Sequence, residues 1–184
     1  MFSPRAFTLA VMIFAALLTR IMPHPPNFTA IGAMCLFGAA YFQNRWIALA
    51  APLAALLLGD LILASSRYDF SSFQWMWMSY VLFGMIALVG MSLRGRVTAV
   101  RVTLTVIGVN ALYFLLSNGE AWLSGHAGQP LTPPGLMASY AAGIPFARNM
   151  LLGDLFYSAV LFGGYELISS QWTVLRRTPV RVRK

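Results

Sequence analysis

The chain has 184 residues, of which 59% are hydrophobic and only 10% are charged, and its mean hydropathy is +0.70. A soluble domain of this size needs far more polar surface, so this composition argues against one and predicts an all-α integral membrane protein. The formal charge of +8 by itself would also fit a nucleic-acid-binding protein, but the distribution of the charges described below favours the membrane.

Apolar segments separated by polar, proline-rich or glycine-rich breaks predict a single transmembrane domain over residues 1–184. A membrane-spanning helix needs about 20 apolar residues, so a six-transmembrane-helix bundle with short connections fills the chain. The expected helices cover residues 5–22, 28–42, 46–65, 75–93, 98–117 and 146–169, and a basic tail covers 170–184. The longest connection, 118–145, is expected to form a mobile lid, with a short re-entrant helix over 136–142.

Lys and Arg residues are distributed unevenly between the two sides of this layout. Ten of the 13 fall on the side of the termini, and three fall on the other: Arg20, Arg67 and Arg148. Because cytoplasmic loops are enriched in Lys and Arg, both termini are predicted to be cytoplasmic. We therefore expect a multi-pass protein of the bacterial cytoplasmic (inner) membrane, whose basic tail meets the lipid bilayer rather than nucleic acid.

The string Leu-Leu-Gly-Asp-Leu occurs twice, at 57–61 and at 151–155. Each copy falls in the third span of its half of the chain. Three spans per half would place the halves in opposite orientations across the membrane, so the string indicates an inverted 3+3 repeat, unless five common residues match by chance. A carboxylate is costly to bury in a span, so Asp60 and Asp154 each need a partner.

Several catalytic and metal-binding patterns are absent from the sequence. It contains no glycine-rich phosphate-binding loop, no His-Glu-x-x-His pair and no Gly-x-Ser-x-Gly elbow. With two histidines, one cysteine and five acidic residues, neither a metal site nor a cofactor is expected. A binding or transport role is therefore favoured over an enzyme.

Polar residues that could bind a ligand gather toward the outer surface of this layout. Helical spacing puts Asn110, Tyr113 and Ser117 on one face of the fifth span, and Asp154 and Tyr157 on one face of the sixth. Acidic and basic groups there would bind a ligand's amine, carboxylate or phosphate, or would only pair with each other. The candidate ligand-binding residues are Arg20, His24, Asn27, Asp60, Asn110, Tyr113, Arg148, Asn149, Asp154 and Tyr157.

Aromatic residues begin the fourth span: Trp75, Trp77 and Tyr80. Tryptophan and tyrosine are enriched where a helix meets the membrane surface, so an interfacial belt is the first interpretation. The same rings could also stack on a flat heterocyclic ligand.

Three segments carry a resemblance to a known family: residues 20–33 (RIMPHPPNFTAIGA), Gly59-Asp60, and residues 144–156 (IPFARNMLLGDLF). Over nearly its whole length the chain resembles a bacterial membrane family of unknown function (domain of unknown function 6580), whose members are described as transport proteins. That family is similar in size and six-helix layout to the substrate-binding S components of energy-coupling-factor (ECF) transporters. The resemblance implies capture of a vitamin or similar micronutrient at the outer face. It also implies a transmembrane coupling subunit with ATPases, docked on the small residues Ala6 and Ala10.

The favoured interpretation is an S-component-like transport protein that captures a small-molecule solute for uptake. The main alternative is a structural or assembly subunit of a membrane complex, in which the acids merely hold arginines. A third is an intramembrane enzyme acting on lipid. Under the first interpretation, Asp154→Ala abolishes ligand binding while the protein still inserts stably; under the second, it impairs folding or assembly.

Overall fold

The computed structural model describes residues 3–66, 77–172 and 175, and every regular element in these ranges is helical. The all-helical prediction is thus confirmed for this part of the chain. Arg67, Trp75 and nearly all of the predicted basic tail lie outside the described residues. The elements are α1 (Pro4–Ile21), α2 (Ile31–Tyr41), α3 (Arg45–Ser66), α4 (Trp77–Gly90), the short 3-10 helix η2 (Met91–Leu93), α5 (Ala99–Leu123) and α6 (Pro133–Gln171).

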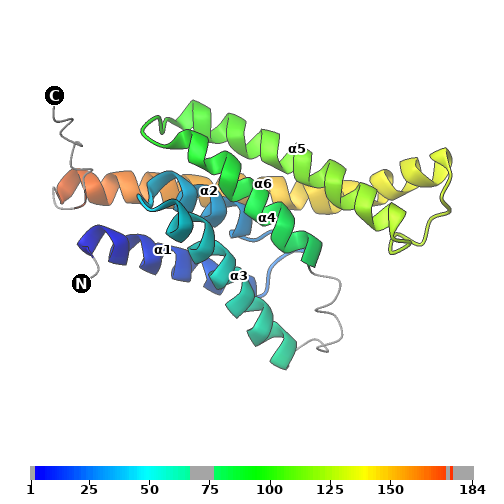
Figure 1. Ribbon diagram of the computed structural model, residues 1–184, viewed down its shortest axis with the longest axis horizontal. Coiled ribbons are helices and arrows are strands. Elements are labelled where there is room, and N and C mark those ends of the chain that lie inside the picture. Colours follow the sequence, from blue (N-terminus) through cyan, green and yellow to red (C-terminus); the bar gives the residue numbers. More distant parts are fainter. Residues whose placement is uncertain (1–2, 67–76, 173–174, 176–184) are drawn as a thin grey trace.

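The helices run back and forth along the long axis of the molecule (Figure 1). The start of α1 and the end of α6 lie at the same end of the bundle, which we call the terminal end. The connection 124–132 lies at the opposite end, the distal end, whereas the connection 22–30 lies beside the middle of α6. Four of the described helices, α1, α3, α5 and α6, are long and apolar enough to cross a membrane. This fits a multi-pass membrane protein.

The helix α2 forms the centre of the core. All 11 of its residues are buried, and it packs against α1, α3, α4 and α6. A helix that is apolar on every side and rich in Gly and Ala suits this position, because small residues let the neighbouring helices approach closely. For example, a Cβ on Gly38 would lie 3.2 Å from the Cδ1 of Ile13 on α1.

The helix α2 is shorter than the predicted span over 28–42. Its 11 residues extend roughly 16 Å, which is about half of a typical hydrocarbon core. The rest of its path is the non-helical segment 22–30, in which Asn27 adopts a positive φ of 61°. Polar backbone groups of this segment have protein partners, such as Asn149 for the Pro26 carbonyl, and these contacts belong to the site described below.

The predicted 118–145 lid is absent as a loop. The helix α5 continues to Leu123 and α6 begins at Pro133, so only residues 124–132 connect them. Pro133 and Pro134 occupy the first turn of α6, where a missing N–H costs nothing. Tyr140 Oη donates to the Leu115 carbonyl at 2.9 Å, which joins the distal parts of the two helices. Prolines that suggested a break therefore start one long helix, and the predicted re-entrant helix over 136–142 is part of it.

Candidate functional site

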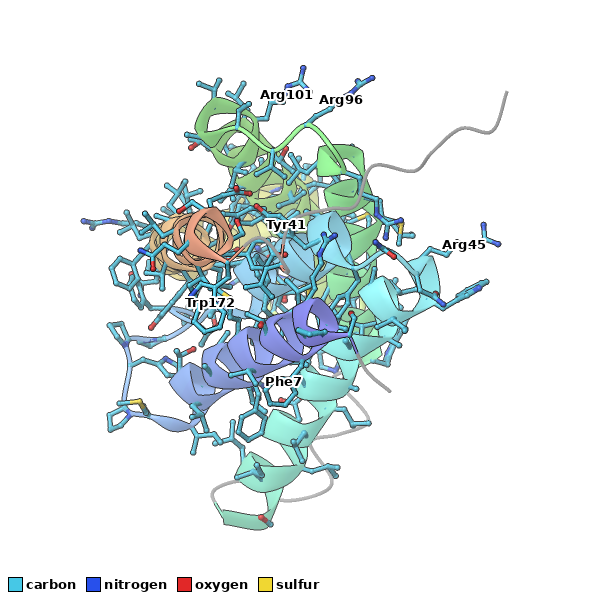
Figure 2. The ribbon with its side chains drawn as sticks, turned by 90° about the vertical axis from the view of Figure 1, so that its left-hand side faces the viewer. Phe7, Tyr41, Arg45, Arg96, Arg101 and Trp172 are labelled. Atoms are coloured by element: carbon cyan, nitrogen blue, oxygen red, sulfur yellow. The ribbon has the colours of Figure 1, made fainter. Side chains whose placement is uncertain are left out.

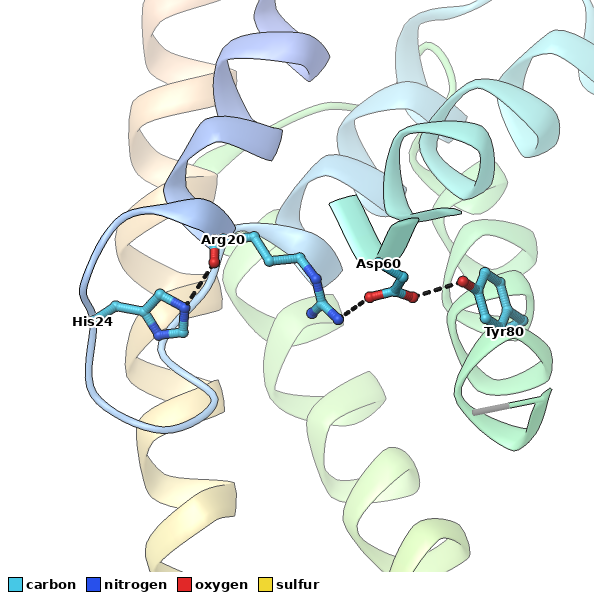
Figure 3. A network of polar contacts seen from close by, with 4 residues as sticks. All are labelled: Arg20, His24, Asp60 and Tyr80. Carbon is cyan, nitrogen blue, oxygen red and sulfur yellow. Dashed lines mark hydrogen bonds and ion pairs between the residues drawn. The ribbon is translucent and has the colours of Figure 1, made fainter. Parts of the chain in front are cut away.

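A buried ion pair ties α1, α3 and α4 together (Figure 3). The guanidinium of Arg20 on α1 contacts the carboxylate of Asp60 on α3, and Tyr80 Oη on α4 donates to the other carboxylate oxygen at 2.6 Å. The carboxyl group of Asp60 is almost wholly buried. His24 Nε2 lies 3.2 Å from the Arg20 carbonyl, which attaches the 22–30 segment to the end of α1. Both oxygens of Asp60 thus have protein partners.

Asp154 has a different set of partners, at the N-terminus of α2. Its Oδ1 accepts the backbone N–H of Ala33 at 2.9 Å, and the N–H of Gly32 also bonds the carboxylate. Its Oδ2 accepts from Nδ2 of Asn110 on α5 at 2.9 Å. The first N–H groups of a helix have no partner within it, and the positive end of the helix dipole favours an anion there. Asp154, which is 1% exposed, therefore caps α2 across the bundle.

Two arginines cap the other end of α2. Arg5 Nη2 donates to the carbonyl of Tyr41 at 2.8 Å, and Arg94 Nε donates to the carbonyl of Ala39 at 2.8 Å. The last carbonyls of a helix also lack partners within it, and cations are favoured at this end. A short helix buried away from water is thus satisfied by one anion at its start and two cations at its end.

The 22–30 segment is fastened to α6. Asn149 Nδ2 donates to the Pro26 carbonyl at 3.0 Å, and the ring of Tyr157 packs against Phe28 with 5.8 Å between centroids. Gly153 makes room for this segment, because a Cβ there would lie 3.1 Å from the backbone nitrogen of Thr29. The glycine of the second Leu-Leu-Gly-Asp-Leu string thus allows the close approach, and the aspartate beside it supplies the helix cap.

A cavity of about 250 Å³ lies between α5, α6 and the 22–30 segment. Three predicted site residues line it, namely Asn27, Asn110 and Tyr113. The other lining residues are Phe114, Ser117, Asn118, Gly143, Phe146, Ala147 and Met150. None of these side chains is charged. The cavity therefore presents amides and hydroxyls on an apolar background, which suits a small polar molecule without a strong charge.

Asn110, which lines the cavity, has one side-chain acceptor without a partner. The side chain of Asn110 is buried, and its Nδ2 donates to Asp154 and to the Val106 carbonyl. These two acceptors fix the orientation of the amide, so its oxygen is Oδ1, and this atom is buried with no hydrogen bond. Buried polar atoms are nearly always hydrogen-bonded. Asn110, a residue of the cavity lining, thus has one acceptor that the described part of the protein does not use.

The structure divides the ten predicted ligand-binding residues into separate groups. Asn27, Asn110 and Tyr113 line the cavity; Asn149, Asp154 and Tyr157 hold its surrounding elements in place; and Arg20, His24 and Asp60 form the network of Figure 3. Arg148 is exposed. No group of three or more His, Cys, Asp or Glu residues that could hold a metal occurs in the described part of the chain.

Residues missed from the sequence lie where the fifth span was expected to end and the sixth to begin. Asn118 and Gly143 fall in the predicted 118–145 connection, and Phe146, Ala147 and Met150 fall at the start of the predicted 146–169 span; all five line the cavity. Gly143 and Ala147 are four residues apart, so they lie on the same face of a helix. This signal was missed because residue 143 was predicted to be in a loop. On α1, Ala6 is partly buried against the core and Ala10 is exposed, with the large side chain of Phe14 exposed one turn later.

Comparison with known proteins gives one family. A model of a family of unknown function, DUF6580, matches residues 1–176. The chain belongs to this DUF6580 family. Searches of curated proteins and of solved structures found no significant match. The DUF6580 membership confirms the first step of the resemblance seen in the sequence, whereas similarity to ECF S components stays a prediction.

Proposed function

We propose that this DUF6580 protein binds a small polar solute in the cavity between α5, α6 and the 22–30 segment. The observation that carries the proposal is a buried acceptor without a partner, Oδ1, on Asn110, a residue that lines a cavity of about 250 Å³. An unpaired buried acceptor costs about 1–3 kcal/mol, which a ligand donor would recover. The ligand class is a neutral molecule that carries an amide N–H or a hydroxyl O–H next to a flat apolar part.

Neighbouring side chains extend this chemistry. Ser117 and Asn118 add further hydrogen-bonding groups, and Phe114 and Phe146 add aromatic surface. The volume is below that of typical drug-sized pockets, which fits a solute of micronutrient size. A cavity on the side of the bundle away from the termini suits uptake if the termini are cytoplasmic, as the distribution of Lys and Arg predicts. Its site of action would then be the bacterial cytoplasmic membrane, with the cavity facing outward.

Coupling to transport is a second step of the proposal. A protein of this size without a phosphate-binding loop needs another source of energy for uptake, and a transmembrane subunit with ATPases would supply it. The docking surface predicted for that subunit includes Ala6 and Ala10 on α1. Ala10 is exposed among apolar side chains, including Phe7 and Phe14, which would face either the lipid or such a partner.

The test compares two alanine-to-phenylalanine variants of α6. Ala147→Phe places a ring in the cavity, whereas Ala142→Phe places the same ring on an exposed position five residues earlier. The full-length protein is purified from its host in mild detergent, and native mass spectrometry detects small molecules that remain bound. We expect a bound molecule in the wild type and in Ala142→Phe, and its loss from Ala147→Phe with unchanged thermal stability. Identical spectra for all three proteins would contradict the proposal and favour a structural subunit.

A further inference from the structure

A second cavity lies at the terminal end of the bundle, far from the solute cavity. Its volume is about 280 Å³, and its walls come from α1, α2, α6 and the connection before α5. The residues that matter here are Arg5, Tyr41 and Glu166. Figure 2 looks onto this end and shows Tyr41 between α1 and α6. By contrast, the labelled Arg45, Arg96 and Arg101 project outward from the rim.

Two nitrogen atoms of the Arg5 guanidinium have no hydrogen-bond acceptor in the described part of the protein. It is only 7% exposed, and its Nη2 donates to the Tyr41 carbonyl. Its Nε and Nη1 are buried without any hydrogen-bond partner. In the described ranges the one ion pair joins Arg20 to Asp60, so Arg5 has no carboxylate partner there. Arg5 lines this cavity, and each of its two parallel donor pairs, Nε with Nη2 and Nη1 with Nη2, includes one nitrogen that the protein leaves without a partner. Such a guanidinium is suited to an oxyanion, which accepts from one of these pairs.

The position of Arg5 at the start of α1 also favours an anion beside it. It lies in the first turn of α1, where the helix dipole is positive and a cation is unfavourable. Arg94 donates to Ala39 beside the same end of α2. Two arginines therefore lie at this end of the core, and Arg5 is also at the positive end of its own helix.

Glu166 supplies a negative charge on the same cavity. Tyr41 Oη donates to Glu166 Oε1 at 2.5 Å, while the carbonyl of Tyr41 accepts from Arg5. Tyr41 thus holds a cation and an anion at its two ends without bringing them into an ion pair. A ligand that bridges them must carry an anionic group for Arg5 and an ammonium for Glu166. A phosphoethanolamine group has both charges, and its primary amine can donate hydrogen bonds to a carboxylate.

The surroundings favour a lipid as the source of this group. Phe7 on α1 and Trp172 at the end of α6 are 67% and 63% exposed, and Leu167 on α6 is also exposed. A tryptophan at a helix end is typical of the level of lipid headgroups, and exposed apolar side chains such as Phe7 and Leu167 would contact acyl chains. We propose that this cavity binds the headgroup of a phosphoethanolamine lipid, with phosphate on Arg5 and ammonium on Glu166.

The test uses full-length protein that has been stripped of lipid in detergent. Dioleoyl phosphatidylethanolamine, phosphatidylglycerol and phosphatidylcholine are added separately, and native mass spectrometry measures the dissociation constant of the first bound lipid. Phosphatidylglycerol lacks the amine, and phosphatidylcholine cannot donate from its quaternary ammonium. We expect the ethanolamine lipid to bind about tenfold more tightly than either. Equal affinities for the three lipids would overturn the proposal.

Three variants assign the two charges. Arg5→Gln should weaken both the ethanolamine and the glycerol lipid, because both use the phosphate. Glu166→Gln should weaken only the ethanolamine lipid and remove the preference for it; since Glu166 is exposed, this variant keeps the test valid if Arg5→Gln does not fold. Arg101→Gln, which removes an exposed arginine at the same end, is the control. Wild-type preference in Glu166→Gln would overturn the assignment.

A competition experiment distinguishes the two sources of the headgroup. Free phosphoethanolamine that displaces the bound lipid would identify the headgroup alone as a sufficient ligand. Retention of the lipid at millimolar phosphoethanolamine would show that the acyl chains also contribute. Ala147→Phe, which alters only the solute cavity, should leave all these lipid affinities unchanged, so this proposal and the solute-binding proposal can fail separately.

Discussion

The carboxylate of Asp154 accepts the backbone N–H of Ala33, which lies 121 residues earlier in the chain, at 2.9 Å. The N-cap position of α2 is Ala30, whose side chain cannot cap a helix. Asp154 supplies that function from α6, and Asn110 on α5 holds its second oxygen. The most deeply buried acid of the described chain is thus a structural element of the core, next to the solute cavity but not on its lining.

The first prediction concerns the stability of Asp154 variants. Asp154→Ala leaves the N–H groups of Gly32 and Ala33 and the amide of Asn110 without an acceptor in a site closed to water. We expect a loss of about 2–4 kcal/mol in the free energy of unfolding. Asp154→Asn keeps one acceptor oxygen and should lose less. Thermal unfolding of the purified protein in detergent measures both, and an Asp154→Ala protein as stable as the wild type would contradict the capping role.

The expected loss of stability makes Asp154→Ala an ambiguous test of ligand binding. Loss of ligand in Asp154→Ala would not separate a binding site from a scaffold, because the variant would also disturb α2. Ala147→Phe alters the cavity without touching the cap, so it gives the clearer answer about solute binding.

The helical content could be predicted from the sequence because hydrophobic segments and their breaks are local signals. The predicted helix boundaries were wrong where one residue type is compatible with two different structures. Pro133 and Pro134 suggested a loop, although proline is also common in the first turn of a helix. The start of α2 at Ile31 rather than at residue 28 could not be foreseen, because it follows from the path of segment 22–30 against α6, which is a tertiary arrangement.

The candidate site could likewise be predicted only in part. Helical spacing correctly placed Asn110 and Tyr113 on one face, and both line the cavity. The repeated Gly-Asp string identified two buried acids, and the cost of burying them predicted that each has a partner. Their partners differ, however: Arg20 and Tyr80 for Asp60, and the start of α2 for Asp154. Backbone N–H groups leave no trace in a sequence, so the second set could not be predicted.

The second prediction concerns Gly32. A Cβ at this position would lie 2.6 Å from Asp154 Oδ1 and 2.7 Å from its Cγ, so Gly32→Ala must displace the carboxylate. We expect it to destabilise the protein nearly as much as Asp154→Ala, even though alanine has the higher helix propensity. Because the two changes remove the same contact, their effects in the double variant should be far from additive.

Gly163 on α6 provides the matched control for Gly32. No atom lies within 4 Å of a Cβ built there. Gly163→Ala should therefore leave stability unchanged or raise it by up to about 1 kcal/mol, the difference in helix propensity. If both alanine variants unfolded at the same temperature, the close approach of Gly32 to Asp154 would not be limiting.

The third prediction concerns the pair Arg20 and Asp60. Removing one partner leaves the other charge buried, so Arg20→Ala and Asp60→Ala should each cost about 3–5 kcal/mol. The double variant should cost much less than their sum. Tyr80→Phe removes a single hydrogen bond to Asp60 and should cost about 1 kcal/mol. Unfolding midpoints in detergent test the cycle, and the exposed Arg148→Ala serves as a control that should behave like the wild type. Additive losses would show that the contact contributes little.

The fourth prediction separates backbone strain from ligand contact at Asn27. This residue has a φ of 61°, and asparagine tolerates this left-handed region better than most other residues. Asn27→Ala should therefore lower the free energy of unfolding by about 1 kcal/mol, whereas Asn27→Gly should be neutral.

Both Asn27 variants also remove the amide from the lining of the cavity. If Asn27 contacts the solute, both should retain less of the co-purified molecule, and the loss in Asn27→Gly should occur without a change in melting temperature. If only Asn27→Ala retains less, then the backbone of segment 22–30, and not the amide, shapes the site.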